Sequence, residues 1–571
     1  MQEPVILLQK KLYTVMQILA CMLCIIVVRL FYLQVIQSFS FLQRGQKNYV
    51  RYQKVESLRG SIFDTKKRLL ATNKPVTDIY WKGTGNTYLS QEQLHELAVI
   101  QAITQKDFNL DEIAYAEKKG KNILIIHDFS LEQLSCLVEE LPACTNLDIQ
   151  THFKRYYPHD NLASHIVGYL SVMEESHEGK MGLEKVLEEQ LHGTPGKKLC
   201  TINSYGKQVS QEEVALADPG QDIFTTIDLD MQMLAEKVFP EGESGVFVIM
   251  DPRNGALKAL VSRPDFNPNL FLEPLNHEQW QEIKEKKPFL NRACNACYPP
   301  ASLFKFITMA AGLELGLIQE HNMWYCSGKY MFANRPYHCA HQEGHGSLST
   351  QEALVQSCNI PFFEIGKRIK IDSLADYARR FGLGQKTNVL FYEQAGLVPT
   401  SSWKREKKKE QWWPGETLST AIGQSYLLVT PMQMLCMISS VCEGYLVKPR
   451  ILEHEAIETK PLDISSSTLT FLKKALKKVT THGTGRSLAD IKDIDIYAKT
   501  GTAQTSDLSK KNLGKQFVEH GWLIIHATYK DRDPLACVIL LENVGSSRVA
   551  TAVAKLFLTQ YGAAIKRADL S

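Results

Sequence analysis

Residues 298–316 read YPPASLFKFITMAAGLELG, and this stretch decides how the C-terminal half of the chain is interpreted. Two prolines precede a run of helix formers that ends at Gly316, so the pattern predicts a helix with Ser302 in its first turn. Lys305 follows three residues later and is expected on the same face, within reach of the serine oxygen. A partly desolvated lysine can take the proton of a serine hydroxyl and make it a nucleophile. Because S-x-x-K also occurs by chance on polar helix surfaces, it needs support from other motifs.

Two further motifs follow in the same half of the chain. Ser357-Cys358-Asn359 comes after a helical pattern and places a hydroxyl and a carboxamide on one short turn. Lys499-Thr500-Gly501-Thr502 lies in a strand pattern, where Gly501 would let a substrate backbone approach closely and Lys499 could bind a carboxylate. The order S-x-x-K, S-x-N and K-T-G is typical of serine enzymes that recognise penicillins.

With these motifs the chain resembles a class B penicillin-binding protein, a membrane-anchored peptidoglycan D,D-transpeptidase, over nearly its whole length. RGSIFD at Arg59–Asp64, RYYPHDNLASHIVGYL at Arg155–Leu170 and the G-L-E box at Gly182–Glu184 resemble motifs of the family's pedestal domain. The W-x-G-E-T form after Trp412 and the E-G-H-G run at Glu343–Gly346 favour the elongation-type members, penicillin-binding protein 2, over the division-type ones.

The resemblance implies a role for each catalytic residue. Ser302 would attack the carbonyl between the two terminal D-alanines of a stem peptide, form an acyl-enzyme and release D-alanine, while Lys305 takes its proton. Ser357 and Asn359 would relay protons and hold the substrate amide. The backbone N–H groups of Ser302 and Thr502 would form the oxyanion hole. An amine of a neighbouring stem peptide then takes the acyl group and completes the crosslink.

The resemblance also implies the ligands. Lys499, Thr500 and Thr502 would hold the terminal carboxylate of the stem peptide, and β-lactam antibiotics would acylate the same serine. Two positions depart from the family's pattern, because Ala301 and Ser425 stand where glycines are common; both substitutions are expected to reshape the cleft without removing a catalytic group.

A cluster of thiols and one imidazole lies between the first two motifs. Cys326, Cys339, His345 and Cys358 are spaced C-x12-C-x5-H-x12-C, which is a plausible tetrahedral zinc set. Some elongation-type penicillin-binding proteins carry a similar structural zinc beside the active site, with acidic, histidine and cysteine ligands. Cys358 is the middle residue of the S-x-N turn, so such a metal would support the catalytic loop. The alternative is a Cys326–Cys339 disulfide in an oxidising compartment.

The composition and the N-terminus limit the cellular setting. With 65 Lys+Arg against 62 Asp+Glu the formal net charge is +3, which argues against a nucleic-acid binder. Residues 12–28 carry no charge, and the apolar character resumes after Arg29, so residues 12–35 are predicted to be a transmembrane anchor. The run is longer than that of a cleaved signal peptide and lacks its cleavage site. Lys10 and Lys11 favour a cytoplasmic tail over residues 1–11.

The expected fold class is α+β. A single N-terminal transmembrane helix would lead to a non-catalytic pedestal domain of the dimerisation type at residues 36–235. The transpeptidase domain, similar to serine β-lactamases, would follow at residues 236–571 with an antiparallel sheet flanked by helices. Residues 245–263 have the pattern of a β-hairpin. Two minor interpretations complete this view: KREKKKE at 404–410 is expected to be a solvated loop, and His520 and His526 are expected on a strand surface.

Competing functions and partners follow from the same resemblance. A D,D-carboxypeptidase or β-lactamase would use water as the acceptor, and a non-catalytic scaffold or antibiotic sensor would not turn over at all. The resemblance implies a single-pass protein of the inner (cytoplasmic) membrane with its catalytic domain in the periplasm. Since no glycan-polymerising domain is recognisable in the sequence, a polytopic membrane glycosyltransferase of the shape, elongation and division family is the expected partner.

Overall fold

The computed structural model describes residues 3–570 apart from 142–145, 174–175, 203–207, 274, 390–391, 506–513 and 531. The chain divides into two compact units. The first comprises residues 1–59 and 192–220, and the second comprises residues 60–191 and 221–571.

The first unit begins with a long apolar helix. α1 (Glu3–Phe31) passes into a π-helical turn, η1 (Tyr32–Ile36), and Lys10–Ile36 is long and apolar enough to cross a membrane. Within the described part of the chain it is the one such helix, and it contains the predicted anchor at residues 12–35. These findings support a single-pass anchor.

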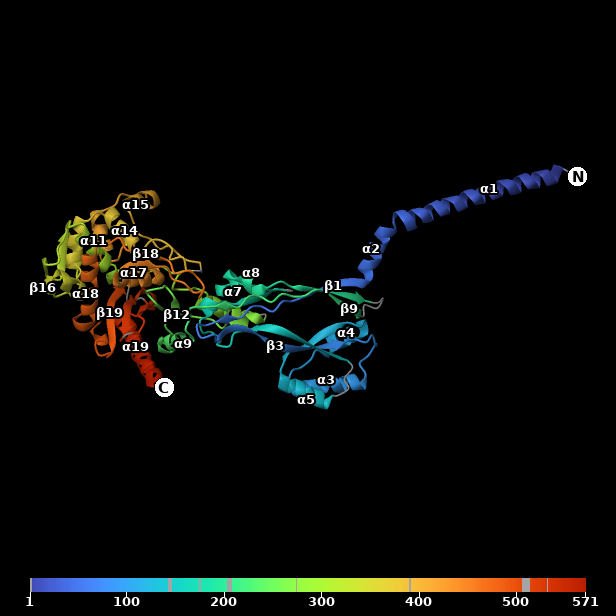
Figure 1. Ribbon diagram of the computed structural model, residues 1–571, viewed down its shortest axis with the longest axis horizontal. Coiled ribbons are helices and arrows are strands. Elements are labelled where there is room, and N and C mark those ends of the chain that lie inside the picture. Colours follow the sequence, from blue (N-terminus) through green and yellow to red (C-terminus); the bar gives the residue numbers. More distant parts are fainter. Residues whose placement is uncertain are drawn as a thin grey trace. The chain divides into compact units, whose positions relative to one another are not determined.

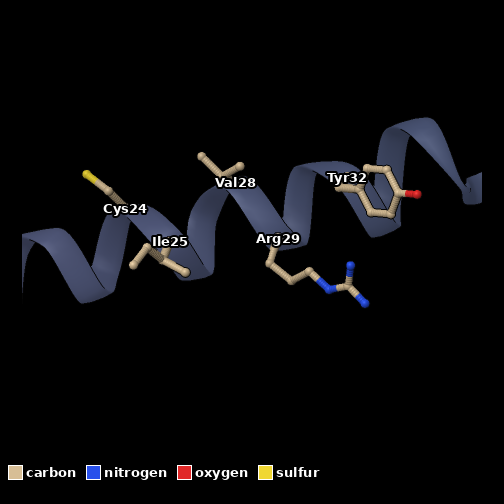
Figure 2. Close-up of a pocket in the computed structure, with 5 residues that line it drawn as sticks. All are labelled: Cys24, Ile25, Val28, Arg29 and Tyr32. Atoms are coloured by element: carbon tan, nitrogen blue, oxygen red, sulfur yellow. The ribbon is translucent and has the colours of Figure 1, made fainter.

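The end of the apolar helix carries a charged and an aromatic side chain. Figure 2 shows Cys24, Ile25, Val28, Arg29 and Tyr32 projecting from this part of the helix, where they line a shallow pocket. The Arg29 guanidinium carbon lies 5.4 Å from the centroid of the Tyr32 ring. An arginine near the end of a span can extend its charge to the interface, and tyrosine is typical of that level of the bilayer.

The remainder of the first unit is a helix and a small sheet. Its elements are α2 (Ser38–Tyr49), β1 (Val50–Val55), β8 (Gly196–Ile202) and β9 (Gln208–Ala215). The sheet order is β1-β8-β9, with antiparallel pairing throughout. β1 and β8, which are about 140 residues apart in sequence, therefore pair in one sheet. This sheet belongs to the same compact unit as the apolar helix.

The N-terminal part of the second unit contains a five-stranded sheet. The order is β10-β2-β3-β4, where β10 is Ile223–Phe224, and β5 pairs with β3. The helices of this part that follow β3 pack their buried leucines and isoleucines against Ile79, Trp81 and Ile126. The elements are β2 (Ile62–Phe63), β3 (Leu69–Lys82), α3 (Gln91–Thr104), α4 (Leu110–Lys119), β4 (Asn122–Phe129), α5 (Leu131–Glu140), β5 (Leu147–Tyr156), α6 (Ser164–Val167), β6 (Leu170–Met173), β7 (Ser176–Gly179), α7 (Gly182–Val186) and α8 (Glu188–His192).

The C-terminal part of the second unit is built on an antiparallel sheet of order β12-β11-β21-β20-β19. Alternate residues of its strands enter two different hydrophobic cores, as expected when both faces are covered. One core includes α9 and α19, and the other includes α11, α17 and α18 (Figure 1). The strands and adjoining helices are α9 (Leu229–Val238), β11 (Gly245–Met250), β12 (Leu257–Arg263), α11 (Lys305–Glu314), α17 (Pro431–Glu443), α18 (Ser466–His482), β19 (Ile494–Ala503), β20 (His520–Tyr529), β21 (Leu535–Leu541) and α19 (Ser547–Leu570).

The remaining elements lie mostly between α11 and α18 in sequence. They are η2 (Pro268–Leu272), α10 (His277–Lys286), η3 (Ala301–Leu303), β13 (Met323–Cys326), β14 (Lys329–Phe332), β15 (Arg335–His338), β16 (Gly346–Ser349), α12 (Thr350–Val355), α13 (Ile360–Arg368), α14 (Ile371–Arg380), α15 (Ser401–Lys408), α16 (Pro414–Ala421), β17 (Tyr445–Val447), β18 (Thr459–Pro461), η4 (Arg486–Leu488) and η6 (Lys515–Phe517). The α+β class, the flanked antiparallel sheet and the β11–β12 hairpin are thus confirmed.

Two minor predictions are wrong in part. Residues 401–408 form α15 instead of a loop; residues 405–410 are exposed as predicted, whereas Lys404 is buried and its ammonium group pairs with Glu416. His520 and His526 both lie on β20 as predicted, but only His520 is partly exposed, whereas His526 is buried with its Nε2 atom 2.7 Å from Glu443 Oε1. In both cases a long-range acidic partner compensates the burial of a polar side chain.

Residues in the motifs by which the chain resembles the pedestal domain make buried polar contacts. Asp64 accepts hydrogen bonds from the backbone N–H groups of Lys66, Arg68 and Leu229, so it fastens the RGSIFD segment to the start of α9. Arg155 and Glu184 are both buried, and Arg155 Nε lies 2.7 Å from Glu184 Oε1. These residues therefore have structural roles.

Replacing Glu184 with glutamine should leave the buried Arg155 charge without its counter-ion. We expect E184Q to lower the free energy of unfolding by about 3–5 kcal/mol, measured by urea titration. E282Q is the matched control, because Glu282 pairs with Lys286 on an exposed helix surface and should unfold like the wild type. Equal stability of E184Q and E282Q would contradict the structural role of the buried pair.

Candidate active site

The nucleophile candidate lies on a tight turn before a buried helix. Ser302 is half-buried on η3, immediately ahead of α11, as the sequence predicts. The turn is fastened from two sides, because Trp522 Nε1 donates to Pro299 O at 3.1 Å and the Ala301 N–H donates to Gly423 O at 2.9 Å. Ser302 is therefore held at a fixed position relative to β20 and to the loop at Gly423.

The ammonium group of Lys305 joins the first motif to the second. Lys305 is fully buried, and its Nζ atom donates to Ser357 O and to Asn359 Oδ1, both at 2.7 Å. Ser357 Oγ is 3.3 Å from the same atom. Burial lowers the pKa of Lys305 from 10.5 to about 8, so about a tenth of the Lys305 side chains are neutral at pH 7. The predicted S-x-x-K and S-x-N motifs are thus brought together.

The third motif forms the edge strand beside the nucleophile turn. Lys499 is fully buried in β19, and its Nζ atom donates to Thr500 O at 3.0 Å. Burial lowers the pKa of Lys499 well below its ordinary value, and the nearby charge of Lys305 lowers it further. A β-carbon at Gly501 would lie 3.2 Å from Leu303 Cγ and 3.4 Å from Pro300 O. The missing side chain therefore permits close packing of β19 against the nucleophile turn.

Three turn residues near the motifs have left-handed backbone conformations. Ala301 has a φ of 49°, Ser357 of 56° and Ser425 of 68°. Glycine adopts this region freely, whereas other L-residues enter it at a cost of about 1–2 kcal/mol. Ala301 and Ser425 are the two positions where the resemblance leads us to expect glycine, and their positive φ angles give a physical reason for that expectation. Backbone strain of this kind is frequent at active sites.

One active-site residue has no counterpart among the sequence predictions. Thr484 lies in a Gly-Thr-Gly turn after α18, and its Oγ1 atom is 2.6 Å from Thr500 Oγ1. The glycines flanking Thr484 are a turn signal in the sequence, but nothing there indicates that the turn returns to the K-T-G strand.

The predicted Cys/His set comes together next to the S-x-N turn. The thiol sulfurs of Cys326, Cys339 and Cys358 and a ring nitrogen of His345 all lie within 4.8 Å of one another. His345 Nδ1 is 3.6 Å from Cys326 Sγ and 3.5 Å from Cys339 Sγ, and the sulfurs of Cys339 and Cys358 are 3.9 Å apart. Ligands of a tetrahedral zinc ion with Zn–S bonds near 2.3 Å are separated by about 3.8 Å, so the four residues fit a closed site.

The cluster also contacts the catalytic turn directly. The Asn359 N–H donates to Cys339 Sγ at 3.5 Å, and Asn359 Nδ2 donates to His338 O at 2.9 Å. The hydrogen bond from the Cys358 thiol lowers the pKa of Cys339, since it stabilises the thiolate, and this raises the pKa of Cys358. One member of the cluster thus tends towards a thiolate, the form in which cysteine binds metals. The three cysteines are free thiols in this structure.

Comparison with known families matches both parts of the chain. Residues 245–559 match the family described as penicillin binding protein transpeptidase domain. Residues 54–225 match the family described as penicillin-binding protein dimerisation domain. The transpeptidase match alone covers more than half of the chain.

Curated relatives align along most of their length. The chain is 28% identical to the peptidoglycan D,D-transpeptidase MrdA of Acinetobacter baumannii, over 93% of this chain and 85% of that protein. It is 25% identical to MrdA of Escherichia coli K12, over 91% and 89%.

Solved structures have the same fold. Penicillin-binding protein 2 of Helicobacter pylori, in its complex with MreC, superposes with a TM-score of 0.77 at 26% identity, covering 90% of this chain and 98% of that one. A chain of a peptidoglycan synthase complex that coordinates polymerisation and crosslinking gives a TM-score of 0.76 at 27% identity, covering 97% and 98%.

The buried environment of Lys305 predicts a pH dependence. If its free amine takes the serine proton, the rate constant for acylation by a penicillin should rise about tenfold per pH unit below pH 8 and level off above it. Stopped-flow measurements with a fluorescent penicillin between pH 6 and 9 test this, with the melting temperature followed over the same range to exclude unfolding. A constant rate between pH 6 and 8 would show that Lys305 is not the base.

Proposed function

This chain belongs to the penicillin-binding protein family, and we propose that it crosslinks peptidoglycan stem peptides during cell elongation as a serine D,D-transpeptidase. The matched transpeptidase domain and the named relatives support acyl transfer as the reaction. The observation that carries the proposal is the meeting of the three motifs: the buried Lys305 ammonium contacts Ser357 and Asn359 one turn from Ser302, and Gly501 of the K-T-G strand packs against the nucleophile turn.

The first half-reaction follows from this geometry. Neutral Lys305 takes the proton of Ser302, whose oxygen attacks the carbonyl carbon between the two terminal D-alanines. The carbon–nitrogen bond breaks, and the proton passes to the departing D-alanine amine, for which Ser357 Oγ is placed as a relay. The side-chain oxygen of Asn359 accepts a hydrogen bond from Lys305 and so orients the lysine. The side-chain nitrogen of Asn359 donates to His338 O.

The second half-reaction needs a nucleophile that replaces D-alanine. An amine of a neighbouring stem peptide attacks the acyl carbon, forms the crosslink and releases Ser302. The backbone N–H groups of Ser302 and Thr502 stabilise the tetrahedral oxyanion, which is typically the largest electrostatic contribution in acyl transfer. The packing of Gly501 against the nucleophile turn supports this assignment, since it keeps the two segments adjacent. No cofactor takes part in this chemistry.

Substrate recognition is assigned to the K-T-G strand. Lys499, Thr500 and Thr502 hold the terminal carboxylate, and the carboxylate of a β-lactam takes the same place. A D,D-carboxypeptidase or β-lactamase would transfer the acyl group to water instead, and the relatives named as transpeptidases do not favour these alternatives.

The partners and the location follow from the same relatives. The anchor and the family support a location of the catalytic unit on the extracytoplasmic side of the inner membrane. Since a Helicobacter pylori relative was solved with MreC and another similar chain in a synthase complex, we expect partners in the shape and elongation machinery. A polytopic membrane glycosyltransferase would supply the glycan strands.

We also propose a structural zinc ion held by Cys326, Cys339, His345 and Cys358. The mutual distances of the four ligand atoms, and the burial of the three cysteines beside a half-buried His345, support a closed site. When bound, the ion would supply stability to the S-x-N turn and no step of the reaction, since all four positions of its coordination would be filled by protein.

Replacing Ser302 with alanine tests the nucleophile. S302A should give no covalent adduct with a fluorescent penicillin, whereas the wild type should give a long-lived adduct that maps to the peptide containing Ser302. K305A should slow acylation by about 10²–10⁴-fold at pH 8 while keeping the serine. Labelling of S302A, or rapid release of the hydrolysed penicillin by the wild type, would contradict the proposed mechanism.

Metal analysis tests the zinc site. Protein purified without chelator should contain about one zinc per chain, and C339S and C358S should lose it and melt at a lower temperature. C136S is the control, because Cys136 is exposed and belongs to another part of the chain. Zinc-free wild-type protein with a Cys326–Cys339 crosslink in its peptide map would overturn this proposal.

A further inference from the structure

The turn after α18 contacts both the end of α12, just before the S-x-N motif, and the K-T-G strand. Gln356 Nε2 donates to His482 O at 3.2 Å, which ties the turn to the residue before Ser357. A β-carbon at Gly483 would lie 2.5 Å from Val355 O, so only glycine permits this approach to the end of α12. The N–H groups of Gly483 and Gly485 both donate to Val479 O at 3.1 Å. The backbone on both sides of Thr484 is therefore fixed.

The fixed backbone presents one hydroxyl to the K-T-G strand. Thr484 Oγ1 lies 2.6 Å from Thr500 Oγ1, a distance typical of a short O–H···O hydrogen bond. Thr500 is buried, whereas Thr484 is exposed, as is Thr502, two residues along the strand. Because alternate residues of a strand share a face, Thr500 and Thr502 lie on the same face of β19.

Hydroxyl chemistry determines the direction of this hydrogen bond when substrate is bound. A threonine hydroxyl has one proton to donate and two lone pairs that accept. If Thr500 donates its proton to a carboxylate, its oxygen is left to accept, and Thr484 Oγ1 is the side-chain oxygen at hydrogen-bond distance from it. A donor chain from Thr484 to Thr500 to the carboxylate would strengthen both bonds, since hydrogen bonds in series polarise one another.

We propose that Thr484 is a positioning residue of the carboxylate site, which fixes the Thr500 hydroxyl as a donor to the terminal carboxylate of stem peptides and β-lactams. This inference rests on the proposed function, because it requires that Thr500 binds the carboxylate. It predicts that the hydroxyl at position 484 matters for carboxylate-bearing ligands and is irrelevant for ligands without the charge.

Valine and serine substitutions separate the hydroxyl from the shape of the side chain. T484V should reduce the second-order rate constant for acylation by benzylpenicillin about tenfold, the size expected for weakening a hydrogen bond to a charged group. T484S keeps the hydroxyl and should acylate within about twofold of the wild type. T481V is the matched control, because Thr481 is exposed at the end of α18 and bonds only to its own helix and to His482.

The methyl ester of benzylpenicillin distinguishes positioning from a general structural effect. The ester lacks the carboxylate charge, so wild type and T484V should react with it at equal rates. An equal loss on acid and ester, or no loss with T484V on the acid, would overturn the inference. Failure of the proposed function is separate, since it would appear as absence of a Ser302 adduct in the wild type.

Discussion

The buried ammonium group of Lys305 is the constraint on which the active site depends. A charged amine without solvent must be surrounded by acceptors, and the acceptors within hydrogen-bond distance are Ser357 O, Asn359 Oδ1 and Ser357 Oγ. All three acceptors belong to one turn, so the position of that turn determines the position of the Lys305 ammonium group. The same burial lowers the pKa of Lys305, and the lysine can then act as a base. Structure and proposed chemistry therefore rest on a single desolvated group.

The turn that accepts hydrogen bonds from Lys305 is itself fixed by contacts on several sides. Ser357 has a left-handed backbone conformation, Asn359 is fixed by His338 O and Cys339 Sγ, and Cys358 belongs to the thiol cluster. A strained turn persists only when its surroundings determine it on several sides. The strand pair β13–β16 and the hairpin β14–β15 provide those surroundings, since Cys326 ends β13, Cys339 follows β15 and His345 precedes β16. A zinc ion at this position would stabilise the turn without contacting substrate.

Much of this arrangement could be predicted from the sequence, because its parts are local. The helix after Ser302, the turn at Ser357–Asn359 and the strand at Lys499 each follow from short patterns, and the order of the motifs indicates that they meet. Contacts between distant segments that belong to none of these motifs could not be predicted. The burial of Lys404 depends on Glu416, and the burial of His526 depends on Glu443. The role of Trp522 as an anchor of the nucleophile turn, and the pairing of Thr484 with Thr500, likewise require the fold to be known.

In the proposed mechanism the two buried lysines would link substrate binding to catalysis. The charge of Lys305 lowers the pKa of Lys499, because two ammonium groups in a desolvated site repel. A carboxylate bound beside Lys499 compensates that charge and raises the pKa of Lys499, so Lys499 stays protonated as the ligand arrives. A protonated Lys499 in turn opposes the protonation of Lys305 and favours its neutral form before the serine proton is transferred. A ligand with the terminal carboxylate would thus favour a protonated Lys499, which binds the carboxylate, and a neutral Lys305, which acts as the base.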